Sequence, residues 1–276
     1  MATDAKTILA QPSIPIALTI AGSDPSGGAG IQADLKTFHQ FGVYGTSVIT
    51  LLTVQNTIRV SAVKPLPASL VLAQLDAVLE DLPPKAAKTG ALGSREIVEV
   101  LSERAAEFPF PLVVDPVMMS KHGKPMLEER ARAALIQKLL PQAFLVTPNL
   151  DEAAAIVGRE IVGLAAVQEA ARAILDMGPQ AVLIKGGHLG KEATDVLCYK
   201  RRIHTFSAPR IQTQHTHGTG CTYSAAITAL LAKGVELIDA IPQAKRFITR
   251  AIETNPGLGR GSGPVNHFAE ICFLVR

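Results

Sequence analysis

The residues best suited to chemistry lie in one short segment, Thr216 to Ser224, with the sequence THGTGCTYS. Two glycines, Gly218 and Gly220, allow a tight turn and a close approach to a ligand. An apolar helical pattern follows, and the N-terminus of a helix offers unpaired N–H groups and partial positive charge to an anion. Cys221 falls in the first helical turn, where the pKa of a thiol tends to fall. The segment therefore predicts a phosphate cradle beside a candidate base, although an ordinary capped glycine loop has the same pattern.

A second glycine cluster follows the first strand-like run of the chain. Residues 16–21 are apolar and suit a buried strand. Residues 22–30 read GSDPSGGAG, and residues 31–38 have a helical pattern. The loop matches neither the dinucleotide-binding pattern nor a Walker A motif, because no Gly-Lys-Ser/Thr sequence follows it. We interpret it as a loop that approaches a ligand closely, while noting that such loops are also common turns.

Strand-like and helical patterns alternate along the chain. Apolar runs typical of strands occupy residues 16–21, 47–53, 112–114, 143–147 and 181–184. Helical patterns lie at about 30–41, 68–80, 94–106, 128–139, 151–157, 165–176, 222–232 and 237–254. This alternation predicts a mostly parallel sheet with helices on both faces, whose ligands collect beyond the carboxyl ends of the strands. The chemistry-bearing loops nearly all follow strand-like runs, so we expect them at one edge of the sheet: 22–30, 115–123, 147–152, 185–190 and 216–221.

Composition and charge exclude several classes of protein. The 276 residues are 47% hydrophobic and only 4% aromatic, which supports a large core and gives no sign of a base-stacking surface. The net charge of +3 is not concentrated in a Lys/Arg block, which argues against nucleic acid or membrane as the main partner. The first 13 residues lack the apolar core of a signal peptide, and no apolar stretch is long enough to span a bilayer. Three separated cysteines suggest neither a disulfide framework nor a zinc site, so we expect a cytoplasmic protein.

Motifs in a fixed order extend from about residue 15 to residue 268. They are AGSDPSGGAGIQADLKT at 21–37, SVIT at 47–50, VQNT at 54–57, DPVM at 115–118, TPNLDEA at 147–153, LIKGGH at 183–188, the Cys221 segment and GPVNHF at 263–268. Together they resemble the hydroxymethylpyrimidine/phosphomethylpyrimidine kinases of thiamine biosynthesis, in the ribokinase-like superfamily. The resemblance implies a three-layer α/β fold in one kinase domain, residues 15–276, after a flexible tail, residues 1–14. We expect no room for a fused thiamine-phosphate synthase domain of ordinary size.

The resemblance also implies ATP-dependent phosphoryl transfer to an alcohol, which needs a proton acceptor and positive groups around the phosphate. Most sugar kinases of the superfamily have an aspartate base at the fourth position of the glycine turn, where this chain has Cys221. A thiolate with a depressed pKa could take the proton. Alternatively, Cys221 only packs near the substrate. The backbone amides of Gly218, Thr219 and Gly220 are expected to form the anion hole.

Residues at other strand ends are expected to hold the nucleotide and its metal. Asn149 and Glu152 resemble the superfamily's Asn-x-x-Glu motif, which positions Mg²⁺ and its waters. Without the resemblance, a Glu in the first turn of a helix is more often a partner of the helix dipole. Asp115 is a second acidic candidate on the metal side. Lys185 is expected to contact a phosphate, with a solvated loop residue as the alternative, and Thr216 completes the phosphate-binding set.

Substrate recognition is expected near the first glycine loop. In the family, the residues at the positions of Asp34 and Gln55 contact the pyrimidine, whose amine and ring nitrogens a carboxylate and an amide can match. Without the resemblance, Asp34 would be interpreted as a solvent-facing helix charge. Val117 is expected to form an apolar wall, and Gly22 to border the substrate. The family often has methionine where this chain has Ala91, a change that would enlarge the pocket and weaken pyrimidine selectivity.

The preferred hypothesis is a kinase that uses ATP and Mg²⁺ to phosphorylate 4-amino-5-hydroxymethyl-2-methylpyrimidine and then its monophosphate. The relatives imply a homodimer. A pyridoxal or pyridoxine kinase is the alternative enzyme, because related branches share the cysteine turn. A non-catalytic pyrimidine- or nucleotide-binding sensor is the alternative of another class. His122 is interpreted as part of a closing flap, and His217 as a residue that shapes the glycine turn.

Overall fold

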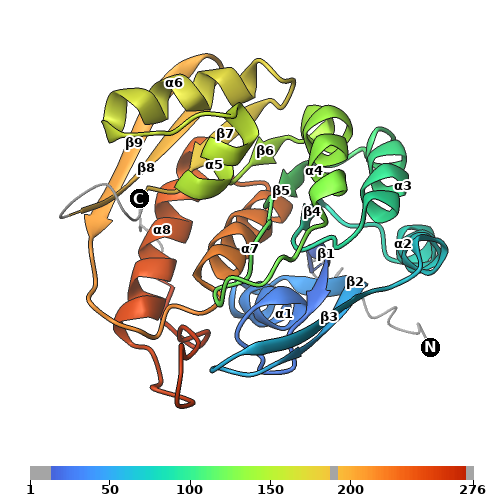
Figure 1. Cartoon of the computed structure of the whole chain (residues 1–276), viewed down its shortest axis with the longest axis horizontal. Helices are drawn as coiled ribbons and strands as arrows, with labels where there is room; N and C mark the ends of the chain where they lie inside the picture. Colours follow the sequence, from blue (N-terminus) through green and yellow to red (C-terminus); the bar gives the residue numbers. More distant parts are fainter. Residues whose placement is uncertain (1–13, 187–191, 272–276) are drawn as a thin grey trace, which may run out of the picture.

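A nine-stranded sheet organises the residues that the computed structural model describes, 14–186 and 192–271 (Figure 1). The strand order is β3-β2-β1-β4-β5-β6-β7-β8-β9. Neighbours from β2 to β7 run parallel, whereas β3, β8 and β9 are antiparallel to their neighbours, which confirms the mostly parallel sheet. The strands are β1 (Ile16–Ser23), β2 (Tyr44–Gln55), β3 (Val60–Pro65), β4 (Ala86–Thr89), β5 (Leu112–Val114), β6 (Leu145–Val146), β7 (Ala181–Ile184), β8 (Glu192–Tyr199) and β9 (Arg202–Pro209).

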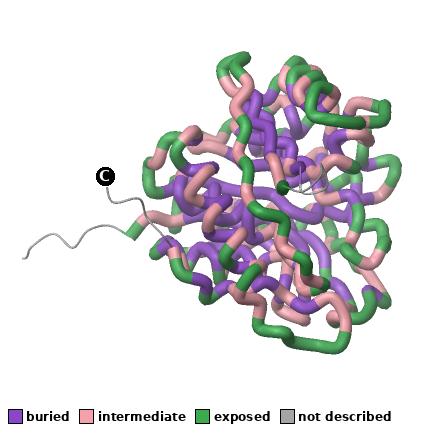
Figure 2. The backbone as a smooth tube through the Cα atoms, turned by 90° about the vertical axis from the view of Figure 1, so that its left-hand side faces the viewer, coloured by how far each residue is buried: buried purple, intermediate pink, exposed green. Residues whose placement is uncertain are grey.

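Helices cover both faces of this sheet. They are α1 (Gly30–Gln40), α2 (Ala68–Asp81), α3 (Arg95–Ala105), α4 (Glu129–Ala134), α5 (Leu150–Val157), α6 (Gly163–Leu175), α7 (Thr219–Ala232) and α8 (Leu237–Glu253). One core takes side chains from α2 to α6 and the other from α1, α7 and α8, in agreement with the three layers expected. Figure 2 shows the buried residues running through the interior, with exposed residues on the peripheral turns. None of these helices is long and apolar enough to cross a membrane.

All the expected strands and helices are present, but four strands were not expected. β4 is only four residues long, and its fully buried Lys88 interrupts the apolar run. The β8–β9 hairpin turns at Lys200 and Arg201, which have φ values of 50° and 59°. Asn and Gly usually occupy such left-handed positions, so the sequence had no turn signal there. The expected tail, residues 1–14, lies almost entirely outside the described residues.

The carboxyl ends of the parallel strands meet at one edge, as expected. Hydrogen bonds between neighbouring strands continue past their ends: the Asp115 amide donates to the Thr89 carbonyl, and the Lys185 amide donates to the Pro148 carbonyl at 2.8 Å. The first turn of α7 reaches the same edge, since a Cβ on Gly220 would lie 3.3 Å from Lys185 Nζ at the end of β7. Gly187 and His188 of the expected Lys185 loop lie outside the described residues.

Candidate active site

The two glycine clusters are in direct contact. Gly218 has a φ of +79°, and a Cβ at this position would overlap the carbonyl oxygen of Gly28. Gly30 has a φ of +58°, and a Cβ there would overlap the carbonyl oxygen of Gly22. Residues with side chains are excluded from both positions by space and by backbone conformation. The loop after β1 and the turn before α7 therefore form one surface. Gly22, near the end of β1, is buried beneath the loop, where its carbonyl oxygen contacts Gly30.

The N-terminus of α7 leaves backbone donors available at this surface. Gly218 is the N-cap residue and provides no side-chain cap. The Thr219 amide bonds to the Thr216 carbonyl at 3.3 Å, and the Thr219 hydroxyl bonds to the same oxygen at 2.8 Å. Within the described residues, the amides of Gly218 and Gly220 have no hydrogen-bond partner. The expected anion hole is thus available at Gly218 and Gly220, whereas Thr216 and Thr219 shape the turn.

Lys185 and Asp115 form an ion pair beside these amides. Their Nζ and Oδ1 atoms are 2.9 Å apart, and a Cβ on Gly220 would lie 3.3 Å from the same Nζ. The Thr147 and Ser224 hydroxyls also donate to Asp115, each at 3.3 Å. Burial opposes the charge of Lys185 and is the largest single influence, but the attraction of Asp115 and Glu152 together outweighs it and raises the lysine pKa. The solvated-loop alternative for Lys185 is wrong, because its side chain is only 15% exposed.

Glu152 lies close to this pair and forms the capping box of α5 with the N-cap residue Asn149. Its Oε2 atom accepts from the Asn149 amide at 2.9 Å, and the Asn149 side chain accepts from the Glu152 amide at 2.8 Å. Burial raises the pKa of Glu152 to about 7, against the attraction of Lys185 and with repulsion from Asp115. A cation would relieve this buried carboxylate.

The carboxylates of Glu152 and Asp115 offer the hard oxygen ligands that Mg²⁺ prefers. No group of three or more His, Cys, Asp or Glu side chains able to hold a metal occurs in residues 14–186 and 192–271. Mg²⁺ characteristically takes only one or two carboxylates and completes its shell with water and substrate phosphates. Glu152 and Asp115 therefore suit an ion that arrives with a nucleotide better than a permanently bound metal.

Cys221 is partly exposed, but its thiol is not poised to ionise. Burial raises its pKa to about 12; Lys88 opposes this shift, whereas Asp34 and Asp115 add to it. The prediction of a depressed thiol pKa is therefore wrong for this structure. The helix N-terminus does not compensate for the loss of water around sulfur. The role of Cys221 as a base remains a prediction that depends on the nearby Lys88 cation.

Asp34 and Lys88 form a fully buried ion pair below this site. Lys88 Nζ is 2.8 Å from Asp34 Oδ2, and the Thr19 hydroxyl donates to the same oxygen at 2.6 Å. The interpretation of Asp34 as a solvent-facing charge is wrong, since the side chain is 0% exposed. Its Oδ1 atom is buried without a hydrogen-bond partner among the described residues. Sequence reasoning missed Lys88, although a lysine inside a short apolar run before a glycine is an available signal.

The other expected substrate residues, Gln55 and Val117, lie on two different segments near the glycine loops. Gln55 ends β2 and lies half-buried beside His217. Val117 packs against a small apolar cluster of Leu51, Ala91 and Met126. Met126 thus provides a large flexible side chain next to the small Ala91. The structure brings Val117 and Gln55 to the edge that holds the glycine loops, while Asp34 lies beneath it.

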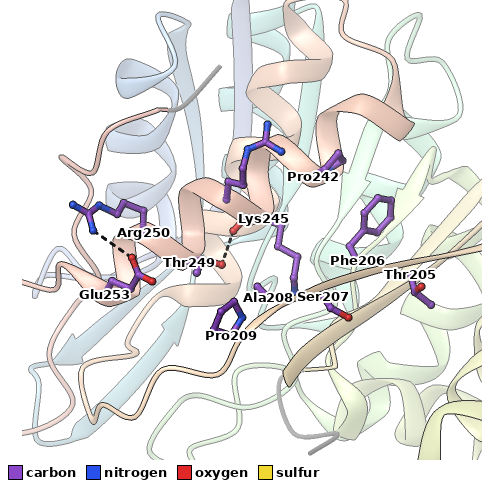
Figure 3. A pocket seen from close by; sticks show the side chains of 11 residues that line it. Thr205, Phe206, Ser207, Ala208, Pro209, Pro242, Lys245, Thr249, Arg250 and Glu253 are labelled. Carbon is purple, nitrogen blue, oxygen red and sulfur yellow. Dashed lines mark hydrogen bonds and ion pairs between the residues drawn. The ribbon is translucent and has the colours of Figure 1, made fainter. Parts of the chain in front are cut away.

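A groove of about 500 Å³ lies between β9 and α8 (Figure 3). None of the expected site residues lines it. Its lining consists of Thr205, Phe206, Ser207, Ala208, Pro209, Pro242, Lys245, Arg246, Thr249, Arg250 and Glu253. Because β9 runs in the same direction as β7, the Pro209 end of the groove lies at the edge of the sheet that holds the glycine loops.

Asp195 connects this groove to the phosphate end of the site. Its Oδ2 atom accepts from Lys245 at 2.6 Å and from the Tyr223 hydroxyl at 3.0 Å. Its Oδ1 atom accepts from the Gly186 amide at 3.0 Å, directly after Lys185. Sequence reasoning missed this buried carboxylate, which fixes the end of β7 against α7 and α8.

Comparisons with known proteins agree with this geometry. The phosphomethylpyrimidine kinase family model matches residues 24–266. The hydroxymethylpyrimidine/phosphomethylpyrimidine kinase of Haemophilus influenzae is 49% identical over 258 residues, covering 91% of this chain and 96% of the relative. The enzyme of the same name from Rhizobium meliloti is 52% identical over 257 residues, covering 92% and 97%.

Solved structures show the same fold. The ADP complex of Bacillus subtilis pyridoxal kinase has a TM-score of 0.86 at 39% identity, covering 93% of this chain and 98% of the other. The phosphomethylpyrimidine kinase of Clostridium difficile 630 has a TM-score of 0.77 at 45% identity, covering 86% and 99%. With a family model matching most of its length and relatives about half identical, this chain belongs to the phosphomethylpyrimidine kinase family.

Proposed function

We propose that the protein uses ATP to phosphorylate 4-amino-5-hydroxymethyl-2-methylpyrimidine, and then its monophosphate, for thiamine biosynthesis. The observation that carries this proposal is the contact between Gly218 and Gly28. It places Cys221 within electrostatic reach of both Lys88 and Asp115. Several relatives at 45–52% identity have this activity in their names, which supports the same substrate here.

The arrangement supports phosphoryl transfer mainly through positioning and charge. The free amides of Gly218 and Gly220 and the Lys185 ammonium would neutralise charge on the transferred group. Cys221 would lie beside the attacking hydroxyl, lose its own proton to solvent when the substrate binds, and then accept the hydroxyl proton as a thiolate stabilised by Lys88. Mg²⁺ bound with ATP would neutralise phosphate charge, and Glu152 and Asp115 would hold it. In these roles the protein forms no covalent bond to the phosphoryl group and acts by positioning and electrostatic stabilisation.

The nucleoside of ATP is proposed to lie toward the groove between β9 and α8. Apolar side chains such as Phe206 and Pro209 line the groove, as suits a base. Two guanidinium nitrogens of Arg246, Nε and Nη2, are buried without a described hydrogen-bond partner. Asp195 links Lys245 of the groove to the amide of Gly186, the residue after Lys185, so the groove lies next to the phosphate end of the site.

A pyridoxal kinase activity is the second candidate. Pyridoxal kinases of Bacillus subtilis and Staphylococcus aureus have TM-scores of 0.85–0.86 to this chain, at 36–39% identity. Ala91 favours a less selective pocket, but Met126 packs into the same cluster and restores apolar bulk. The higher identity to the pyrimidine kinases favours the first proposal.

ADP release with MgATP tests the two candidates directly. Hydroxymethylpyrimidine, its monophosphate, pyridoxine and pyridoxal are compared with a control that lacks substrate. Turnover of both pyrimidines, with pyridoxine far poorer, is expected. Preference for pyridoxal or pyridoxine with an inert pyrimidine monophosphate would overturn the first proposal in favour of the second. ADP release no faster than in the control would support a sensor.

We also propose that residues 15–276 form one kinase domain that acts in the cytoplasm as a homodimer. The shared sheet with a core on each face supports a single domain. Apolar side chains on β2 and the turn after it are available to a second copy: Leu52 is 46% exposed, Val54 61% and Ile58 48%. Burial of such a patch would favour association.

A further inference from the structure

One ring nitrogen of His217 faces two side chains. Nε2 lies 2.7 Å from Asp24 Oδ2 and 3.1 Å from Nε2, the amide nitrogen, of the Gln55 side chain. His217 and Asp24 are buried, at 5% and 3% exposure, and Gln55 is half-buried at the end of β2. An imidazole nitrogen either donates through one hydrogen or accepts through one lone pair. The role that Nε2 takes toward Asp24, donor or acceptor, therefore also decides which end of the Gln55 amide can face it.

Asp24 decides which role this nitrogen takes. Its Oδ1 atom accepts from the Ser26 amide at 2.9 Å and the Ser26 hydroxyl at 2.7 Å, and Oδ2 accepts from the Ala29 amide at 2.9 Å. Burial opposes the charge, but hydrogen bonds from His217 and Ser26 outweigh it and lower the pKa of Asp24. Asp24 is thus a carboxylate, which can only accept. Nε2 of His217 must carry a hydrogen and donate it.

The orientation of the Gln55 amide follows from this. An N–H group repels the NH₂ end of the amide and attracts its oxygen, and a half-turn of the amide exchanges the two at the same distance. With the oxygen toward His217, the NH₂ group is turned away from it. In the described part of the chain, no other residue hydrogen-bonds to this amide. The site is left with one free, oriented NH₂ group, which offers two N–H donors.

The position of the imidazole ring is itself fixed. The His217 amide donates to the Gly263 carbonyl at 3.0 Å, and its carbonyl accepts from the Val265 amide at 3.3 Å. The ring packs against Gly28, where a Cβ would lie 2.5 Å from ring atom Cδ2. Backbone and ring contacts together hold Nε2 between Asp24 and Gln55.

We propose that His217, held by Asp24, is a positioning residue that turns the NH₂ group of Gln55 toward the substrate and so selects a ring nitrogen acceptor. This rests on the proposed function and on the expectation, implied by the resemblance to the family, that Gln55 contacts the pyrimidine. The opposite amide orientation would present oxygen and select the exocyclic amine of the same ring. Selection of a ring nitrogen predicts that an analogue with a C–H group in its place is a poor substrate.

Replacement of Gln55 by glutamate separates the two orientations. Glutamate keeps the oxygen that accepts from His217 but has no NH₂ group to donate. We expect Gln55→Glu to lower kcat/KM for hydroxymethylpyrimidine by roughly 10- to 100-fold, while the KM for ATP is unchanged. The matched control is Asn56→Asp, which adds the same charge one residue away in a turn and should behave as wild type. Unchanged kcat/KM in Gln55→Glu would overturn the proposal.

Two variants of His217 test the positioning role itself. His217→Phe frees the amide to rotate, so the KM for the pyrimidine should rise roughly 5- to 10-fold with kcat retained. His217→Gln, which can donate an N–H group to Asp24, should recover part of this loss. An equal fall in kcat for both variants, without a change in KM, would contradict a positioning role.

A tautomer measurement keeps this inference independent of the substrate assignment. Nitrogen-15 NMR of the histidine rings in the full chain, with His217→Phe to assign the signal, distinguishes hydrogen on Nε2 from hydrogen on Nδ1. Hydrogen on Nε2 is expected. A neutral ring with hydrogen on Nδ1 would overturn the proposal whatever the substrate is. A substrate panel that favours pyridoxal would instead count against the proposed function and leave the tautomer result standing.

Discussion

Two site residues, Cys221 and Glu152, titrate unlike exposed side chains of their types. Burial is the largest cause in both, and it raises the pKa of the thiol to about 12 and that of the carboxyl to about 7. Each group lies within reach of one lysine, Lys88 or Lys185, that opposes the shift. The site therefore holds protons that substrate or metal binding could release, and Cys221 can act as a base only after its own proton has left.

Cys221→Ala tests whether the thiol is a base. The expected result is a loss of at least ~100-fold in kcat, the usual contribution of a general base. Cys221→Asp should recover part of the rate, because a carboxylate near Lys88 can accept the proton. Steady-state kinetics with hydroxymethylpyrimidine measure both.

Cys198→Ala is the matched control, since Cys198 is a buried free cysteine of the core, on β8. It should lower stability but leave kcat near wild type. Near-normal turnover by Cys221→Ala would show that the thiol only packs beside the substrate. In that case electrostatic stabilisation by the anion hole would be the main catalytic contribution.

Glu152→Gln should change stability in a pH-dependent way. The folded-state pKa of about 7 lies above the ordinary 4.5, so the folded protein binds this proton more tightly than the unfolded chain. That contribution to stability is complete below about pH 4.5 and is lost as pH rises through about 7. Glutamine keeps the acceptor for the Asn149 amide without the charge. We therefore expect a higher Tm than wild type at pH 8 and a similar Tm at pH 5.

Thermal unfolding without Mg²⁺ or nucleotide gives this comparison. Glu169→Gln, a change at an exposed ion pair with Arg159, is the control and should show little pH-dependent difference. Glu152→Gln should also raise the Mg²⁺ concentration needed for half-maximal turnover, because one candidate metal ligand is lost. A Tm difference that is the same at pH 5 and pH 8 would contradict the raised pKa.

The contact between the loop after β1 and the turn before α7 is what assembles the candidate site. These segments are almost 190 residues apart in the chain, and they meet where Gly218 leaves no room for a side chain beside Gly28. Through this contact, α7 brings its free amides to Lys185 at the end of β7. Activity should therefore fall when this contact is disrupted, even if each segment keeps its own conformation.

Gly218→Ala and Gly234→Ala form a matched pair that isolates the contact. Both glycines have left-handed φ values, +79° and +78°, so both variants incur the conformational cost of roughly 1–2 kcal/mol. A Cβ at Gly234 meets nothing within 4 Å, whereas one at Gly218 overlaps the Gly28 carbonyl. We expect Gly234→Ala to lose only stability, and Gly218→Ala to lose activity by ~100-fold or more as well. Kinetics and Tm of both variants measure the difference, and equal activities would contradict it.

The molecule as a whole places its chemistry at one edge of a sheet with a separate core on each face. Side chains of α2 to α6 stabilise one face, and those of α1, α7 and α8 stabilise the other. The antiparallel strands β3 and β9 end the sheet on either side. The outward side of β2 carries the exposed Leu52 and Val54, far from the groove beside β9. A second copy could therefore cover this side without closing the groove.

Val54→Lys tests the proposed homodimer. Light scattering after size-exclusion chromatography should give a dimer for the wild type and a larger monomer fraction for the variant, because a buried lysine is costly. Leu70→Lys is the control, since Leu70 is also exposed, at 48%, but lies on α2. A monomeric wild type, or equal weakening by both variants, would argue against this interface.

Local patterns were enough to predict most of the elements. Every expected helix is present because apolar periodicity of 3.6 residues is a local property, and the motif loops meet because parallel strands end at one edge. The hairpin at Lys200 and Arg201 could not be predicted, because neither residue is typical of left-handed turns. Strand β4 was missed because the apolar pattern does not anticipate a fully buried lysine.

The sequence by itself determined the fold class, the family and the identity of the chemical groups at the site, since these depend on residue types and spacing. The fold then determined which of those groups are in water and which are paired. Asp34 became a buried partner of Lys88, and the thiol of Cys221 gained a high pKa instead of a low one. His217 came to link Asp24 with Gln55. Solvation and long-range pairing depend on residues distant in the chain, so no local pattern could supply them.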